Sequence, residues 1–370
     1  MSARSLTGRG PTLSVISGEL LSALDDTRVA RSRAAAPGEW YSFGRGALHV
    51  AADDDVFRER FRRIFGECRC DPEAAMSLVQ GRLHVRTILP AGVVEAELAC
   101  PEPIDLLALV MDLFSARDLT EVPSVRPGWR MLAERHASAD PVLAFKGDRI
   151  VAPRGYGWQA VMAHCGVIRV MTLQKDMVFF HAASAAIGDK GVLIFGNKGA
   201  GKTTLSLALA ERGHAFLGDE YAAVSATDRQ LVPFRRTASI REGVRPGGVD
   251  EFLAGRDCDT EINIDGTRRV RAAVGEMFPA AAVRPAQLTH AFFLRRLSAR
   301  PEVERFTPRV EDLPLLAPLL CTVWGMSAGQ LSLKFLRLLS GTRCFYLSPG
   351  GLPEDTAELI ERTVEDECQS

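Results

Sequence analysis

Residues Gly196-Asn-Lys-Gly-Ala-Gly-Lys-Thr203 decide the fold of this chain. They match the pattern Gly-x-x-x-x-Gly-Lys-Ser/Thr, a loop that binds phosphate groups. An apolar run, Val192–Phe195, precedes them and is typical of a buried strand, and the stretch Thr204–Arg212 that follows has the composition of a helix that Gly213 ends. This strand–loop–helix context predicts a phosphate cradle made of backbone N–H groups and a helix N-terminus.

The cradle defines a set of candidate nucleotide-binding residues. Lys202 is expected to reach the outer phosphates, and the Thr203 hydroxyl is expected to ligate Mg²⁺. The expected cofactors are therefore ATP and Mg²⁺. The complete set of expected nucleotide contacts is Gly196, Asn197, Lys198, Gly199, Ala200, Gly201, Lys202, Thr203 and Thr204.

An acidic pair follows the cradle. Asp219 comes seventeen residues after Lys202, a gap that a helix, a glycine turn and a short strand over His214–Leu217 would fill. We expect this strand to return beside the strand Val192–Phe195, so that its carboxyl end brings Asp219 to the phosphates. The carboxylate would then either hold Mg²⁺, a role that Glu220 can share, or accept the proton of an attacking hydroxyl. A solvated turn residue is the alternative interpretation.

Composition places the chain among ordinary globular proteins. Apolar residues make up 46% and charged residues 25% of the 370 residues, which is enough to bury a core. The net charge of −1 favours neither nucleic acid nor an anionic membrane as a partner. No apolar run reaches the roughly 18 residues of a membrane helix, and the N-terminus lacks the apolar block of a signal peptide. The eight cysteines form no zinc motif and are expected to be reduced, so a cytoplasmic location is expected.

The sequence patterns divide the chain into three parts. Residues 1–36 are rich in Ser, Arg, Gly and Ala and are expected to be poorly ordered. Residues 37–160 carry no catalytic motif and are expected to form an α+β domain that recognises the substrate, whereas residues 161–370 hold the cradle and are expected to form an α/β domain. The expected strands cover 40–50, 78–86, 177–187, 221–225, 231–234, 288–297, 302–306 and 344–347, and the expected helices are one capped by Asp54 and others over 104–114, 158–165, 313–320, 329–339 and 353–367.

His181 is a further candidate, on the strand that comes before the cradle strand. Taken alone, a histidine beside Phe179 and Phe180 is more often a core residue than a catalyst. Three stretches together nevertheless resemble the core of the bacterial HPr kinase/phosphorylase family. They are His181-Ala-Ala-Ser, the cradle, and Glu211-Arg-Gly-His-Ala-Phe-Leu-Gly-Asp-Glu220. That core runs His-Gly-x, a P-loop, Arg-Gly-His and a paired Asp-Asp. The resemblance covers residues 175–240, extends to the C-terminus and does not include the first 150 residues.

The resemblance implies a P-loop domain of the HPr-kinase type, with a fold similar to that of phosphoenolpyruvate carboxykinases. It implies that Asp219 accepts a proton and that His181 orients Asp219. It also implies a homo-oligomer, because members of the family often form hexamers. Two departures stand out: Glu220 replaces the second Asp, and the family signature Glu-x-Arg-Gly-x-Gly has only an echo in Ser239-Ile-Arg-Glu-Gly-Val244. The second departure argues against HPr as the acceptor and against phosphorylase activity.

Several arginines follow the acidic pair. Arg235, Arg236 and Arg241 come after an expected hairpin, where they would either offset charge on the transferred phosphoryl group or form a solvated sheet edge. For the run Arg268-Arg269-Val-Arg271, exposed side chains are favoured over a mobile basic lid.

Together these features favour an ATP- and Mg²⁺-dependent kinase that acts on a hydroxyl. The acceptor is expected to be a Ser or Thr of a peptide, such as a natural-product precursor, or a small metabolite. Two alternatives stay open: a nucleotide-binding regulatory module, and an ATPase without an acceptor. The expected catalytic residues are Asp219, His181 and Lys202, and the expected metal ligands are Thr203 and Glu220.

Overall fold

The computed structural model divides the chain into two compact units. The first comprises 1–40, 47–61 and 80–170, and the second comprises 41–46, 62–79 and 171–370. The structure describes residues 38–88, 93–99, 119–134, 141–153 and 158–366, apart from 125, 244, 255, 257, 259, 263–267, 282 and 313–327. The predicted helices over 104–114 and 313–320 and the predicted poorly ordered segment 1–36 lie outside the described residues. The functional division at residues 37 and 161 stays a prediction.

The first unit is an antiparallel sheet covered by helices. The order of its strands is β2-β4-β5-β9-β8-β7-β6. A Cβ added to Gly166 of helix α5 would lie 3.0 Å from Leu83 Cδ2 and 3.1 Å from Leu48 Cδ2, so the helix packs closely on the sheet at this glycine. The bounds are β2 (Gly46–Ala52), α2 (Asp55–Phe65), β4 (Val79–Ile88), β5 (Val93–Ala99), β6 (Leu119–Val122), β7 (Arg130–Glu134), β8 (Pro141–Lys146), β9 (Arg149–Pro153) and α5 (Trp158–Leu173).

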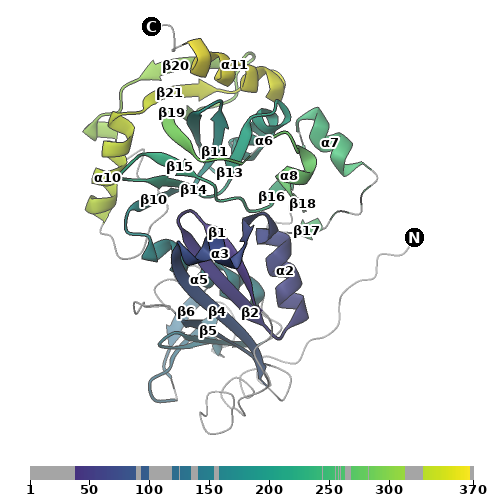
Figure 1. Cartoon of the computed structure of the whole chain (residues 1–370), viewed down its shortest axis with the longest axis vertical. Coiled ribbons are helices and arrows are strands. Elements are labelled where there is room, and N and C mark those ends of the chain that lie inside the picture. Colours follow the sequence, from purple (N-terminus) through teal and green to yellow (C-terminus); the bar gives the residue numbers. More distant parts are fainter. Residues whose placement is uncertain are drawn as a thin grey trace. The chain divides into compact units, whose positions relative to one another are not determined.

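The second unit is built on a mostly antiparallel sheet (Figure 1). Its strands follow the order β10-β14-β15-β19-β12-β11-β13, and β21 pairs with both β19 and β20. Only the pairs β12–β19 and β19–β21 are parallel among the described strand pairs of this sheet. The bounds are β10 (Met177–Phe180), β11 (Ala182–Ile187), β12 (Lys190–Phe195), β13 (Ala215–Gly218), β14 (Ala222–Ser225), β15 (Gln230–Val232), β19 (Ala286–Leu294), β20 (Glu302–Phe306) and β21 (Arg343–Ser348).

Strand β12 is buried on both faces, which explains its continuous apolar sequence. Val192 and Ile194 face α6 (Lys202–Glu211) and α11 (Pro353–Asp366), through a cluster that includes Leu205 and Ile360. Leu193 and Phe195 face the other side, where α10 (Ala328–Ser340) packs its Phe335 and Leu338 against the sheet. The strand that feeds the cradle is therefore held by packing on both sides.

A small sheet packs against the remaining face of α6. It comprises β16 (Ala238–Arg241), β18 (Arg268–Ala272) and β17 (Thr260–Ile262), in the order β16-β18-β17. Leu207 and Ala210 of α6 share a core cluster with Ile240, Ala272 and nearby side chains of α7 (Gly247–Leu253) and α8 (Val274–Met277). This contact fixes the small sheet beside the helix that follows the cradle.

The segments 41–46 and 62–79 of the second unit brace the chain after β15. They carry most of β1 (Glu39–Phe43), together with η1 (Gly66–Cys68), β3 (Arg69–Cys70) and α3 (Pro72–Met76). Glu67 accepts hydrogen bonds from Arg235 Nη2 at 2.6 Å and from the backbone N–H groups of Val274 and Gly275 at 2.9 and 2.8 Å. Arg235 is therefore engaged in a buried ion pair away from the cradle.

Most predicted elements are present, with four differences. The predicted strand 40–50 is two strands, because Gly44 makes a turn at φ 65°. The predicted strand 177–187 breaks at His181 into β10 and β11, and helix α5 continues beyond the predicted end at 165 to Leu173. The apolar segments 288–297 and 302–306 follow each other closely and predict a hairpin, but strand β20 pairs with β21. The predicted cap is confirmed, since Asp54 Oδ1 accepts the N–H of Phe57 at 2.8 Å.

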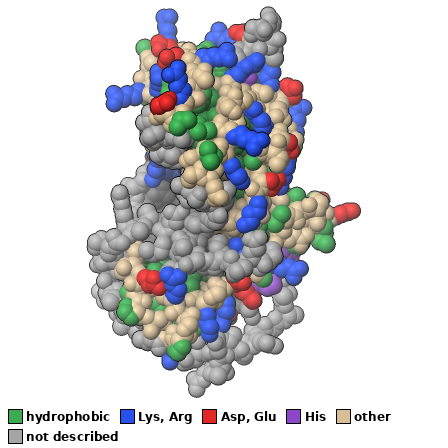
Figure 2. Space-filling model, turned by 90° about the vertical axis from the view of Figure 1, so that its left-hand side faces the viewer, with side chains coloured by type: hydrophobic (Ala, Val, Ile, Leu, Met, Phe, Trp, Pro, Cys, Tyr) green, Lys and Arg blue, Asp and Glu red, His purple; other side chains and the backbone are tan. Residues whose placement is uncertain are grey.

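The described surface is mixed in character. On the face shown in Figure 2, Lys and Arg side chains alternate with Asp and Glu, and hydrophobic side chains gather in small groups. None of the helices in the described ranges is long and apolar enough to cross a membrane.

Candidate active site

The predicted cradle connects β12 to α6 and depends on two glycines. Gly199 has φ +87°, and Gly201, the residue before the first turn of α6, has φ +99°. A residue with a Cβ is strained in this left-handed region, so glycine lets the loop curl back over the helix N-terminus. The loop thereby acquires the form that a phosphate requires, with the positive end of α6 at its base.

Lys202 is held inside this loop. Its side chain is buried, and Nζ donates hydrogen bonds to the carbonyl oxygens of Gly196 at 2.6 Å and Asn197 at 3.3 Å. These carbonyls offset the cost of burying an ammonium group. Because the donors of an ammonium group can rotate, Lys202 can exchange loop carbonyls for phosphate oxygens with little movement of the backbone.

The sheet brings three candidate residues to one edge. Strand β11 is antiparallel to both β12 and β13, with Ala182 opposite Phe195 and Ser184 opposite Gly218. The start of β11 therefore lies beside the ends of β12 and β13. Three parts of the site therefore meet at the same edge of the sheet. They are His181, which precedes β11, the cradle, which follows β12, and Asp219, which follows β13.

This arrangement corrects one sequence-based prediction. The strand before Asp219 pairs with β11, and it does not lie beside the cradle strand. The physical reason is the tight turn at Gly188 (φ 62°), which folds β11 back onto β12 and occupies the position that β13 was expected to take. Asp219 reaches the cradle region all the same, where it bonds to Thr203, and the intervening strand β11 brings His181 to the same edge.

Asp219 is a buried carboxylic acid next to the cradle. Only 6% of the residue is exposed, and its carboxylate accepts a hydrogen bond from the Thr203 hydroxyl. Burial, together with the neighbouring charge of Glu220, raises the pKa of Asp219 to about 6, although Arg236, Thr203 and Arg271 act in the opposite direction. The group is therefore ionised at neutral pH but close to its titration range.

His181 and Glu220 complete the acidic end of the site. Burial and the charge of Lys202 lower the pKa of His181, so the imidazole is neutral at pH 7. A hydrogen bond links the imidazole to the backbone carbonyl of Glu220. The Glu220 side chain forms an ion pair with Arg236, whose side chain is 5% exposed, at 2.6 Å between Oε2 and Nη1. The turn that carries Asp219 is therefore held by two contacts of Glu220, one of its backbone with His181 and one of its side chain with Arg236.

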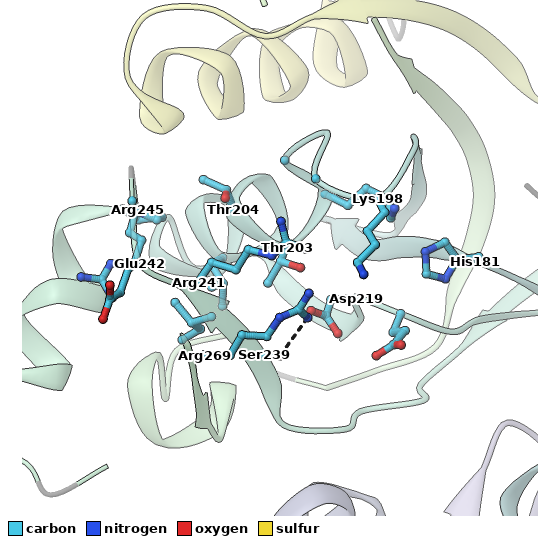
Figure 3. A pocket seen from close by; sticks show the side chains of 18 residues that line it. His181, Lys198, Thr203, Thr204, Asp219, Ser239, Arg241, Glu242, Arg245 and Arg269 are labelled. Atoms are coloured by element: carbon cyan, nitrogen blue, oxygen red, sulfur yellow. Dashed lines mark hydrogen bonds between the residues drawn. The ribbon is translucent and has the colours of Figure 1, made fainter. Parts of the chain in front are cut away.

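These residues line one cavity of about 360 Å³ (Figure 3). Asp219, His181, Glu220 and Lys202 all contribute to its wall. Of the expected nucleotide contacts, Lys198, Gly199, Gly201, Lys202, Thr203 and Thr204 line the cavity, whereas Gly196, Asn197 and Ala200 do not. The cavity brings together all the predicted catalytic and metal-binding residues, whose roles stay predictions.

Sequence reasoning missed part of the opposite wall. Arg245, Ser239 and Glu242 line the cavity and were not singled out, although Ser239 and Glu242 fall in the faint signature echo. The favoured interpretation of Arg269 as an exposed side chain is wrong, because it lines the cavity, and Arg271 acts on the charge of Asp219. Alternation along β16 and β18 could have indicated this, since every second residue of paired strands shares a face.

The donor groups fit Mg²⁺ carried in with a nucleotide. Thr203, Asp219 and Glu220 offer oxygen atoms in one cavity, and magnesium prefers oxygen ligands. Within the described ranges, no group of three or more His, Cys, Asp or Glu residues is arranged to hold a metal. One or two carboxylates suffice when phosphate oxygens complete the coordination, so the residues present fit the ion in that form.

Comparison with known proteins gives one match to a curated sequence. No family model matches the chain. Over 190 residues, 51% of this chain, the sequence is 26% identical to the HPr kinase/phosphorylase of Aromatoleum aromaticum. This chain is similar to HPr kinase/phosphorylase. The resemblance seen in His181, the cradle and Asp219-Glu220 is thereby confirmed, although the match spans only about half of that relative, 54% of its length.

Among solved structures, the HPr(Ser) kinase/phosphatase of Coxiella burnetii matches 52% of this chain and 96% of its own. The sequence identity is 17% and the TM-score is 0.27, a value too low to support a conclusion. The α/β class expected for the cradle-containing half is confirmed by the strands and helices of the second unit.

The raised pKa of Asp219 predicts that the ionised residue destabilises the fold at pH values above about 6. Its pKa is about 6 in the folded protein against 3.8 in the reference state, so the folded state binds the proton more tightly. The resulting penalty is absent below about pH 4 and reaches about 3 kcal/mol above pH 6. We expect Asp219→Asn to raise Tm at pH 8 by several degrees more than at pH 4, as measured by calorimetry. Asp189→Asn, at an exposed turn, is the control; an equal change at both pH values would contradict the burial argument.

Proposed function

We propose that the protein is a phosphotransferase that moves the γ-phosphoryl group of ATP to a hydroxyl group of an acceptor. The observation that supports this most strongly is the contact between Asp219 and Thr203, which places a carboxylate with a pKa of about 6 at the end of a phosphate cradle. A carboxylate at that position, with that pKa, suits a general base. The similarity of half the chain to HPr kinase/phosphorylase supports the same class of reaction.

In this proposal the cradle binds the phosphates. The N–H groups of the loop and the first turn of α6 point to the phosphate oxygens. Lys202 leaves the carbonyls of Gly196 and Asn197 and offsets the charge that develops on the transferred group. Thr203 and Glu220 are the proposed ligands of Mg²⁺, which when bound neutralises phosphate charge.

Asp219 activates the acceptor in the transfer step. Its ionised carboxylate takes the proton of the acceptor hydroxyl while the hydroxyl oxygen forms a bond to the γ-phosphorus. The bond between that phosphorus and the bridging oxygen breaks, and ADP departs with the electron pair. His181 is proposed to position Asp219 through its bond to the Glu220 backbone, and Arg236 to hold the Glu220 side chain.

The acceptor is proposed to be a Ser or Thr of a peptide, or a small metabolite with a hydroxyl group. Residues 37–160 are proposed to recognise it. The lack of a Glu-x-Arg-Gly-x-Gly signature after Glu220 argues against transfer to HPr itself. A cytoplasmic location and a homo-oligomer likewise stay predictions.

Mass spectrometry after incubation with Mg²⁺ and γ-¹⁸O-labelled ATP tests the proposal. Peptides and metabolites from the genomic neighbourhood serve as acceptors, and the expected product is an acceptor that carries labelled phosphate. Free labelled phosphate in equal amount with and without acceptor would instead indicate an ATPase. Tight nucleotide binding with neither product would indicate a regulatory module.

A further inference from the structure

Two residues from α2 and η1 hold the backbone between β15 and β16. The Cys68 thiol donates to the carbonyl of Arg235, with 2.8 Å between Sγ and O. The carbonyl of Ile64 accepts the backbone N–H of Thr237 at 2.9 Å and its hydroxyl at 3.3 Å. All four residues belong to the second unit, but Ile64 and Cys68 lie far outside residues 175–240, which carry the resemblance to HPr kinase/phosphorylase. A segment from before residue 150 therefore supports the catalytic half of the chain.

The Glu67 side chain makes the charged contact of this support. Its Oε1 accepts from Arg235 Nη2 at 2.6 Å and from the N–H of Gly275 at 2.8 Å, and its Oε2 accepts the N–H of Val274 at 2.9 Å. Only 12% of the Glu67 side chain and 9% of the Arg235 side chain are exposed. Two carboxylate oxygens thus serve three donors, whereas an amide has one acceptor oxygen and would turn an NH₂ group toward a donor. The position of Arg235 therefore depends on the carboxylate.

The next residue along the chain, Arg236, carries this support to the cavity. Its guanidinium group lies over the Phe65 ring, 6.0 Å from the centroid, and forms the ion pair with Glu220 at 2.6 Å. The N–H of Phe234 donates to the carbonyl of Leu217 at 2.8 Å, which joins the same stretch to the end of β13. Because Arg236 is buried and its backbone is held on both sides, its position fixes the direction of the Glu220 carboxylate, which lines the cavity.

We propose that Glu67 is a positioning residue: through the two consecutive arginines it orients the Glu220 carboxylate toward the Mg²⁺ that accompanies the nucleotide. This inference rests on the proposed function, in which Glu220 is a ligand of the ion. Groups that orient metal ligands from outside the coordination sphere matter for affinity, and their loss typically weakens metal binding about 10- to 100-fold. The α2–η1 segment is then part of the machinery that binds the ion, although it lies outside the resemblance to the kinase family.

Binding of Mn²⁺, which replaces Mg²⁺ and is detected by electron paramagnetic resonance, tests this positioning without knowledge of the acceptor. Full-length protein is kept in excess over the non-hydrolysable analogue adenylyl imidodiphosphate, so that no free analogue competes for the ion. Calorimetry first gives the metal-free affinity for the analogue. The variants are Glu67→Gln and Glu67→Asp, of which the second keeps the charge but is one methylene shorter. Glu276→Gln is the matched control, because it removes the same charge from an exposed residue next to Gly275, a partner of Glu67. Tm reports whether each variant folds.

We expect both Glu67 variants to bind Mn²⁺ about tenfold more weakly than wild type and Glu276→Gln, with an unchanged metal-free affinity for the analogue. Wild-type Mn²⁺ affinity in Glu67→Asp would overturn the positioning, and this variant decides alone if Glu67→Gln does not fold. A tenfold loss of metal-free analogue affinity would also overturn it, because the cradle itself would then be disturbed.

Glu220→Gln separates this inference from the proposed function. If Glu220→Gln loses Mn²⁺ affinity while both Glu67 variants bind like wild type, only the inference fails. Retained Mn²⁺ affinity in Glu220→Gln would contradict the proposed metal ligand, and the inference with it. Failure of wild type to bind the analogue at all would contradict the proposed function.

Discussion

Replacement of Lys202 by alanine is expected to reduce kcat at least about 100-fold and to leave the fold intact. The ammonium group is buried in the loop and bonded to the Gly196 and Asn197 carbonyls, so it is preorganised for charge on the transferred phosphoryl group. Removal of one preorganised donor of this kind costs roughly 3–4 kcal/mol of transition-state stabilisation. Transfer of labelled phosphate, measured in single turnovers, gives the rate constant of the transfer step, which contributes to kcat and does not include product release.

Lys334→Ala is the control for this change. Lys334 lies on α10 and donates to the carbonyl of Lys175, far in sequence from the cradle, so its loss should leave turnover unchanged. Circular dichroism and Tm report whether each variant folds. Turnover near the wild-type value in folded Lys202→Ala would exclude the cradle from the reaction.

Asp219→Asn is expected to lower kcat by roughly 10²–10⁴-fold, the range contributed by a general base, while nucleotide affinity stays within a few-fold of wild type. The amide has nearly the shape of the carboxylate but cannot take the proton. In wild type the base is active only when ionised, and its pKa is raised to about 6. Because kcat/KM reports the groups of the free enzyme, we expect kcat/KM to fall as pH decreases through about 6, to half its maximum there. The pH profile of kcat/KM provides the test.

The matched control is Asp189→Asn in the exposed turn between β11 and β12, which should keep both the rate and the profile. An Asp219→Asn enzyme with wild-type kcat would refute the role of general base. A wild-type profile that stays flat from pH 5 to pH 8 would show that the raised pKa does not govern the rate.

The local features of this site could be predicted from the sequence because they depend on near neighbours. The cradle is one continuous stretch, and its strand and helix follow from the apolar run before it and from Gly213 after it. The closing helix α11 was found for the same reason, since its apolar positions repeat at helical spacing. The short gap between Lys202 and Asp219 limited where the acid could lie, so its approach to the cradle was expected.

The features that escaped prediction depend on pairing between distant segments. Nothing in the sequence of β13 distinguishes β11 from β12 as its partner, and the hairpin turn at Gly188 decides the matter. The position of Arg269 depends on the pairing of β18 with β16, twenty-eight residues earlier at Arg241. Glu67, which engages Arg235, comes from a segment 168 residues away. Strand order and such long-range ion pairs leave little trace in local periodicity.

A crystal structure with Mg²⁺, ADP and aluminium fluoride tests the central claim most directly, since aluminium fluoride mimics the phosphoryl group in the transition state of the transfer. The account predicts that the phosphates occupy the Gly196–Thr203 loop and that Lys202 Nζ has moved from the Gly196 carbonyl to the fluoride. It also predicts that the Asp219 carboxylate lies about 3 Å from the axial oxygen on the attacking side, within hydrogen-bond reach. A nucleotide bound outside the loop, or an Asp219 carboxylate turned away beyond the reach of one bridging water, would contradict the claim.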